Sequence, residues 1–423
     1  MSEERDARIL KADRRQLQMR TYDLDATLPA EHRARLIWAF IEKLDLSRFY
    51  DKIDARGCEP GRSAIDPRIL LALWLFATSE GVGSAREIDR LCERDDAYRW
   101  ICGGVSVNYH RIADFRVENG QELDDLMTQV LGVLLHQGLV VDLTRVAQDG
   151  MRVRASAGAA SFRRKNSLES CLGEAREQVE RVKREAEQPD PKRTARGQAA
   201  AERAAKEREA RLQAALAELP KAAASKPAKE RDDARVSTTD PDARVMKMGD
   251  GGFRPAYNVQ LATDTKSRVI VGVGVTNVGS DKGQLEPMLA EIERRTGRLP
   301  QEYLVDGGFT NLAAIDEADR KGVTVYAPVQ KPKLEGVDPH ARKDKDTDRT
   351  AAWRERMGTI AAKAIYKERS ATAETVNADL RIHRGLDRLS VRGSGKVLSV
   401  TLWMAITYNI LRWISLGEAG GVA

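Results

Sequence analysis

Residues 303–310 read YLVDGGFT, an apolar run that ends in Asp306 and is followed by two glycines. The pattern predicts a short buried strand with a carboxylate at its carboxyl end. In open α/β sheets this end of a strand borders the crevice where ligands bind, and glycines let a ligand or a neighbouring backbone come close. Taken alone, the stretch fits an ordinary loop at the end of a strand equally well.

The segments around this strand alternate between strand and helix patterns. The predicted elements are strands over 139–156, 256–263, 268–278, 303–306 and 323–329, with helices over 281–297 and 312–322. The first three strands would form an antiparallel meander, because a tight turn over 264–267 joins the second to the third. The later strand–helix–strand steps require parallel pairing through right-handed crossovers. We therefore predict a mixed five-stranded sheet flanked by helices.

The first strand, LVVDLTRVAQDGMRVRAS over 139–156, carries a second aspartate. Alternation places Asp149 on a mainly apolar face, next to Gly150. Asp149-Gly150 by itself is typical of a turn. Asp142 and Asp264 are weaker candidates, because the first has the opposite parity and the second lies in the predicted turn.

The predicted strand order places Asp149 and Asp306 on adjacent strands, where two carboxylates repel each other. Hard divalent cations with oxygen ligands relieve that repulsion, and Mg²⁺ in particular binds substrate phosphates. A third ligand is expected from the helix over 370–383, and Glu374 is the best candidate because small and apolar neighbours flank it. Glu368 is the competitor, six residues away and therefore pointing differently on a continuous helix.

Three further side chains surround Glu374 in the sequence. Tyr366, Arg369 and Arg381 would place a phenol and two guanidiniums around one carboxylate, which suits a phosphate backbone passing over metal. A glutamate on the surface of a helix is the ordinary alternative. The five histidines show no zinc-ligand spacing, which argues against a zinc site.

The N-terminal part, from about residue 30 to 137, has helical patterns. A short segment over 107–120 carries Arg111 and Arg116 among apolar residues, which suits a helix that reads a DNA groove. An ordinary helical domain fits this segment at least as well.

Two other stretches stand apart from the sheet. Residues 160–235 are rich in Ala, Arg, Lys and Glu and predict an inserted pair of polar helices joined at Pro189-Asp190-Pro191. Their mixed charges argue against a dedicated DNA clamp. The apolar stretch over 397–411 is shorter than the ~18–20 residues of a membrane span and predicts a buried core helix.

The bulk composition agrees with a cytoplasmic protein that has a polyanionic partner. The net charge is +6 and the sequence pI is about 9.0, which mildly favours polyanions. The four cysteines form no CxxC pair, and the charged N-terminus lacks the apolar core of a signal peptide.

In combination, these residues resemble an insertion-sequence transposase of the DDE class, whose catalytic domain has a retroviral-integrase-like, RNase H-like fold. Asp149, Asp306 and Glu374 match its three carboxylates in order and in element type. The segments FYDKID, IDPRILLALWLFA and SVRGSGKV, the last with Arg392 and Lys396, are also similar to this group.

The Y-x2-R … E-x6-K/R signature of one large bacterial group resembles Tyr366, Arg369, Glu374 and Arg381, with two departures. Four residues separate Arg369 from Glu374, where three is commoner, which puts the role of Arg369 in question. Arginine stands at 381 in place of the usual lysine, which keeps the charge and changes the geometry.

The resemblance implies an all-α DNA-binding domain over 1–137, a catalytic RNase H-like domain over 138–159 and 236–416, and a helical-hairpin insertion over 160–235. It implies phosphoryl transfer with two Mg²⁺ ions, for which Mn²⁺ can substitute, with Asp149 bridging the metals. The implied partners are double-stranded DNA, as terminal inverted repeats and as target, and a second copy of the chain in a synaptic dimer. The implied location is the bacterial cytoplasm, at the nucleoid. The expected DNA contacts are Tyr366, Arg369, Arg381, Arg392, Lys396, Arg111 and Arg116.

Three alternatives stay open at this point. The first is a metal-dependent DNA nuclease without strand transfer, and the second is a non-catalytic DNA-binding derivative of a transposase. The third is an architectural coiled-coil protein built on residues 160–235, which leaves the alternating strands unexplained.

Overall fold

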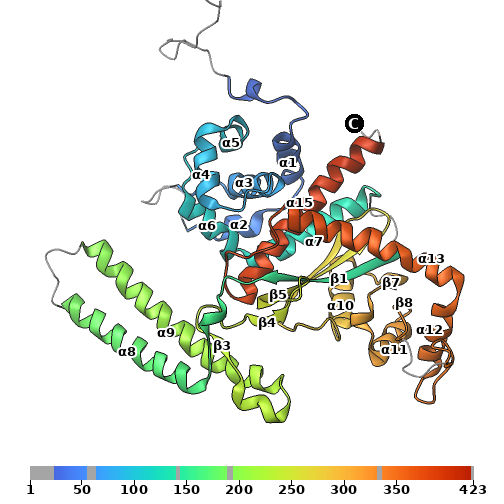
Figure 1. Ribbon diagram of the computed structural model, residues 1–423. Coiled ribbons are helices and arrows are strands. Elements are labelled where there is room, and N and C mark those ends of the chain that lie inside the picture. The colour runs from blue at the N-terminus through green and yellow to red at the C-terminus, as the bar shows by residue number, and fades with distance from the viewer. Residues whose placement is uncertain (1–22, 55–62, 140–142, 188–193, 331–335, 421–423) are drawn as a thin grey trace, which may run out of the picture.

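The computed structural model describes residues 23–54, 63–139, 143–187, 194–330 and 336–420. Figure 1 shows three parts: a group of N-terminal helices, a central mixed sheet with helices around it, and a long helical hairpin that projects away from both.

The N-terminal part is all helical, as predicted. Its helices are α1 (Arg33–Ile41), α2 (Ser47–Asp51), α3 (Pro67–Ser79), α4 (Ala85–Arg94), α5 (Asp96–Cys102), α6 (Tyr109–Glu118) and α7 (Gly120–His136). Helix α3 begins where the sequence indicates, because the Asp66 side chain accepts a hydrogen bond from the backbone N–H of Arg68. The amphipathic stretch over 84–104 forms two helices, because Asp95 has an extended backbone and caps α5, which separates α4 from α5.

The sheet confirms the predicted strand order. Its strands are β1 (Arg145–Arg154), β4 (Arg244–Lys247), β5 (Phe253–Asp264), β6 (Ile270–Thr276), β7 (Glu302–Leu304) and β8 (Thr324–Tyr326). Strands β1, β5 and β6 form the antiparallel meander, β7 pairs with β1 in parallel, and β8 pairs with β7 in parallel. The short strand β4, which the sequence analysis did not anticipate, pairs with the start of β5 on the same edge as β6.

Helices cover both faces of the sheet. On one face lies α10 (Leu285–Thr296), close enough to β6 that a Cβ at Gly272 would lie 2.5 Å from the Met288 sulfur. Helix α11 (Leu312–Arg320) leads from β7 to β8 and is followed by α12 (Asp348–Gly358). The other face is crossed by α13 (Ile360–Arg369) and α14 (Thr375–Ile382), joined through a π turn at Ser370–Glu374 (Figure 1).

The C-terminal helix α15 (Ser394–Gly420) connects the N-terminal helices to the sheet. It packs against α3, α7 and β6, and its buried side chains belong to the same apolar cluster as theirs. Asn409 on α15 accepts a hydrogen bond from Ile270 N–H and donates one to Ile270 C=O, which satisfies the backbone of the strand β6. Although this helix is long and apolar enough to span a membrane, 72% of its most apolar window is buried inside the fold, as expected for a core helix.

The predicted insertion is a helical hairpin of α8 (Lys165–Glu187) and α9 (Ala195–Ala224). A two-stranded ladder at its base pairs β2 (Phe162–Arg163) with β3 (Val236–Ser237). The proline-containing joint predicted between the two helices falls outside the described residues.

Candidate active site

Asp149 and Asp306 lie at the same edge of the sheet. The parallel register of β1 with β7 pairs Ala147 with Leu304, and each aspartate is two residues further along its chain. The Asp306 side chain is held by the backbone N–H of Gly308, which donates to Oδ1 at 2.7 Å. The structure therefore brings together the two carboxylates that the sequence analysis singled out.

The guanidinium of Arg369 lies between these carboxylates. Its Nη2 is 2.9 Å from Asp149 Oδ1 and 3.7 Å from Asp306 Oδ2. The other oxygen of Asp149 accepts a hydrogen bond from Asn377 Nδ2 at 2.8 Å. Both oxygens of Asp149 thus have partners on the helix above the sheet.

The environment of Asp149 disfavours its negative charge. Burial raises the pKa of the Asp149 carboxyl above its usual range, and the neighbouring charges of Asp306 and Asp281 raise it further. Arg369 acts in the opposite direction, yet the net direction remains upward. A further cation at this point would therefore stabilise the ionised form.

The π turn explains the unusual spacing between Arg369 and Glu374. A π turn closes between residues i and i+5, so it places residue i+5 where an α turn would place i+4. Glu374 follows Arg369 by five residues, and Asn377 follows it by eight. Because the π turn absorbs one residue, Glu374 and Asn377 take the places that residues four and seven further along have in an α-helix. Both therefore lie on the face of Arg369. The extra residue is absorbed in the turn, and the helix beyond it keeps its orientation towards the aspartates.

Glu374 itself is at the rim of this face. Its side chain is exposed, and within the described residues it forms no hydrogen bond or ion pair. In the described parts of the chain, no three His, Cys, Asp or Glu side chains lie close enough together to hold a metal ion. The structure thus assembles two of the three predicted carboxylates and leaves the third facing solvent one helical turn from Arg369.

The competing carboxylates have other partners. Glu368 forms an ion pair with Arg145 at 2.5 Å, and Arg145 also pairs with Glu302, four residues before Asp306. Asp264 accepts hydrogen bonds from the backbone and hydroxyl of Ser267 in the turn after β5. Asp142 lies outside the described residues.

The remaining predicted DNA contacts near the site lie along the C-terminal segments. Tyr366 is half-buried, and burial raises the pKa of its phenol. Arg381 on α14 and Lys396 in the first turn of α15 are exposed. Arg392 is exposed too and donates to the Ser156 carbonyl at 3.4 Å.

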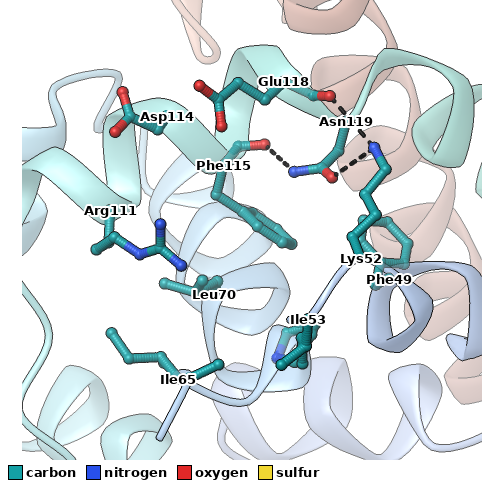
Figure 2. Close-up of a pocket in the computed structure, with 12 residues that line it drawn as sticks. Phe49, Lys52, Ile53, Ile65, Leu70, Arg111, Asp114, Phe115, Glu118 and Asn119 are labelled. Carbon is teal, nitrogen blue, oxygen red and sulfur yellow. Dashed lines mark hydrogen bonds between the residues drawn. The ribbon is translucent and has the colours of Figure 1, made fainter. Parts of the chain in front are cut away.

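The two arginines of α6 differ from each other. Arg111 is exposed and lines a pocket of about 370 Å³ over Phe49, Leu70 and Phe115 (Figure 2). Arg116 instead stacks over the Trp74 ring at 4.6 Å.

The Arg116 guanidinium is also held by hydrogen bonds to the Gly83 carbonyl and the Ser390 hydroxyl. In this conformation Arg116 joins α6 to the loop before α15.

Two residues at the site were missed. Asn377 stands in the predicted helix as an unremarked polar residue, and only its spacing from Arg369 and Glu374 could have singled it out. Asp281 was assigned to a helix over 281–297, but α10 begins at Leu285, and Asp281 lies buried in the preceding loop.

Comparison with protein families gives two matches along the chain. Residues 22–118 match a family described as a transposase domain (DUF772), and residues 231–410 match the transposase DDE domain. Asp306, Arg369 and Glu374 lie within the second match, whereas Asp149 lies between the two, ahead of the inserted hairpin.

No curated protein and no solved structure matches the chain. The two family matches agree with the mixed sheet, its flanking helices and the helical N-terminal region. The chain belongs to the insertion-sequence DDE transposases.

Proposed function

We propose that the chain cuts DNA at the ends of an insertion sequence and joins those ends to target DNA, with Asp149, Asp306 and Glu374 holding divalent cations. The observation that carries this proposal is the pair of aspartates on adjacent parallel strands with Arg369 between them. Positive charge nearby stabilises such a pair in its ionised form, and its all-oxygen donor set suits Mg²⁺ or Mn²⁺.

The proposed cofactor is a pair of Mg²⁺ ions, which Mn²⁺ can replace, and Asp149, Asp306 and Glu374 would hold them. When bound, such ions activate a water or a 3′-hydroxyl for attack on phosphorus and stabilise the charge that develops there. Glu374 would complete the set of three carboxylates, since the π turn places it on the face of Arg369.

The other side chains of the site position the carboxylates and the DNA. Asn377 orients Asp149 through Oδ2, and the Gly308 N–H orients Asp306 through Oδ1. Arg369 offsets the negative charge of Asp149 and Asp306, and its guanidinium would also suit a phosphate oxygen of bound DNA. Tyr366 lies half-buried one turn before it and lines the same approach.

DNA would reach the site along the exposed basic residues of the C-terminal segments, Arg381, Arg392 and Lys396. The helical N-terminal region, with Arg111 exposed on α6, is the proposed reader of terminal inverted repeats. We further propose that two copies assemble on paired ends, and that the protein acts on the bacterial nucleoid in the cytoplasm. Arg392 lies two residues before α15 and Lys396 lies in its first turn, on the segment that follows the helix of Glu374 and Arg381.

A metal-dependent nuclease without strand transfer would use the same carboxylates. A non-catalytic derivative would bind DNA ends without cutting them. The presence of both aspartates at one sheet edge, of Arg369 between them and of Glu374 on the same helix face favours a catalytic protein over the derivative.

The test is a strand-transfer reaction. A labelled DNA fragment that carries the element's own end is incubated with the protein, Mg²⁺ or Mn²⁺, and a supercoiled target plasmid. The proposal predicts metal-dependent nicks at the repeat boundary and joined products in the plasmid. Nicks without joined products would favour the nuclease, and binding of the end without nicks in either metal would favour the non-catalytic derivative.

A further inference from the structure

Asp281, in the loop between β6 and α10, is fixed against the sheet face opposite Asp149. Its side chain is 8% exposed. Oδ1 accepts hydrogen bonds from Asn258 Nδ2 at 2.8 Å and Gln260 Nε2 at 2.7 Å, and Oδ2 pairs with Arg152 Nη2 at 3.1 Å. Three donors on two adjacent strands therefore fix both oxygens of one buried carboxylate.

The donors all project from the same face. The register of β1 with β5 sets Arg152 opposite Asn258 and Gly150 opposite Gln260. Asp149 has the opposite parity and points to the face covered by Arg369 and the π turn. Asp281 and Asp149 thus lie on the two sides of one strand.

The same carboxylate reaches both glycines that follow the aspartates of the site. A Cβ at Gly150 would overlap Asp281 Oδ1, and a Cβ at Gly308 would lie 2.9 Å from Asp306 Oδ1 and 3.6 Å from Asp281 Oδ2. Gly150 follows Asp149 directly, and Gly308 is two residues after Asp306. Oδ1 of Asp281 therefore lies nearest the segment that carries Asp149, and Oδ2 lies nearest the segment that carries Asp306.

This arrangement explains why glycines follow both aspartates. A side chain at Gly150 would overlap the Asp281 carboxylate, and the Gly308 backbone must come close while its N–H donates to Asp306. The β1–β7 ladder ends at Ala147 and Leu304, before either aspartate. Beyond that point no hydrogen bonds between β1 and β7 fix the distance between Asp149 and Asp306. The Asp281 carboxylate lies beside Gly150 on one segment and near Gly308 on the other.

We propose that Asp281 is a positioning residue that sets the separation of Asp149 and Asp306, and hence the geometry of cation binding. This inference rests on the proposed function, because it concerns how the two aspartates hold metal. Asp281 itself is not a metal ligand, since Arg152, Asn258 and Gln260 already occupy its oxygens. Losing a residue that orients metal ligands typically weakens metal binding about 10–100-fold.

The experiment measures Mn²⁺ binding to the metal-free full chain by electron paramagnetic resonance, alongside thermal unfolding and cleavage of the element's end. The variants are Asp281→Asn and Asp281→Ala. The matched control is Asp264→Asn, a carboxylate that is also buried and accepts two hydrogen bonds, but in the turn at the other end of β5.

The proposal predicts that both Asp281 variants fold and bind Mn²⁺ at least about tenfold more weakly than the wild type. Cleavage should fall with the lost affinity and recover partly at high Mn²⁺. Asp264→Asn should lower the unfolding temperature and leave the Mn²⁺ affinity unchanged.

An Mn²⁺ affinity in Asp281→Asn equal to that of the wild type, whatever its stability, would overturn the proposal and leave Asp281 a structural residue only. If both Asp281 variants fail to fold, an Arg152→Met chain provides the second measurement. This change removes the guanidinium that holds Asp281 Oδ2 at 3.1 Å and leaves both aspartates of the site untouched, so it should weaken Mn²⁺ binding in a folded protein, and unchanged binding would refute the idea. Failure of the proposed function looks different, because the wild type itself would then bind no Mn²⁺ and cut no DNA.

Discussion

Arg369 is the cation that the fold supplies to Asp149 and Asp306, and its removal should be costly in the absence of metal. Arg369→Met keeps the aliphatic stem and removes the charge. Breaking a buried ion pair by deleting one partner costs about 3–5 kcal/mol of unfolding free energy. Because the Arg369 and Asp149 side chains are 12% and 18% exposed, some solvent screening remains, and we expect the lower end, about 3 kcal/mol.

Added divalent metal should stabilise Arg369→Met against unfolding more than it stabilises the wild type. In the wild type, a cation must displace Arg369 from the carboxylates, whereas in Arg369→Met it meets two uncompensated aspartates. Metal stabilises a protein in proportion to the logarithm of its concentration over Kd, so the tighter site gains more. The rise in unfolding temperature on adding Mn²⁺ should therefore be larger for Arg369→Met than for the wild type.

The assay is thermal unfolding with and without Mn²⁺, with Arg354→Met as the matched control. Arg354 forms a buried two-bond ion pair with Asp346, at 2.7 and 2.9 Å, away from the site. The control should lose comparable stability and keep the wild-type response to Mn²⁺. A metal-free Arg369→Met as stable as the wild type, or one with the same Mn²⁺ response as the control, would refute the reasoning.

Three more outcomes are expected. Gly150→Ala should destabilise the protein by about 1–3 kcal/mol through overpacking, while Gly307→Ala, whose Cβ meets no atom within 4 Å, should unfold at the wild-type temperature. Deleting Ala371 should convert the π turn to an α turn, keep Glu374 on its face and preserve most DNA cleavage; complete loss of cleavage in a folded protein would count against this account of the spacing. Arg111→Ala should weaken binding of the element's end and reduce the salt dependence of binding by about one unit of slope, and an unchanged slope in a filter-binding titration would remove Arg111 from the interface.

Much of the sheet was predictable from the sequence because alternation and turn residues are local signals. The hairpin between β5 and β6 and the crossovers into β7 and β8 fix the strand order, and this order brings Asp149 beside Asp306. Strand β4 was missed because it is only four residues long, although turn residues flank it, Asp240-Pro241-Asp242 before it and Asp250-Gly251-Gly252 after it.

The finer features of the site depend on contacts between segments far apart in the chain. The contact of Asp281 with Gly150 joins residues whose proximity follows only from the register of β1 with β5. The extra residue between Arg369 and Glu374 was visible in the sequence, but a single insertion in a helix can end it, rotate it or form a π turn. The contact of Arg116 with the Trp74 ring joins two helices and could not be read from the sequence neighbours of either residue.

The central claim is that Asp149, Asp306 and Glu374 act together in metal-dependent DNA cleavage. The most direct test is Mn²⁺-dependent nicking of the element's end by Asp149→Asn, Asp306→Asn and Glu374→Gln, with Glu368→Gln as the control on the same helix. We expect the three variants to bind the end and to lose nicking by a factor of about 10³ or more, a loss of roughly 4 kcal/mol in transition-state stabilisation, while Glu368→Gln cuts normally. Nicking that survives Glu374→Gln and disappears in Glu368→Gln would contradict the account.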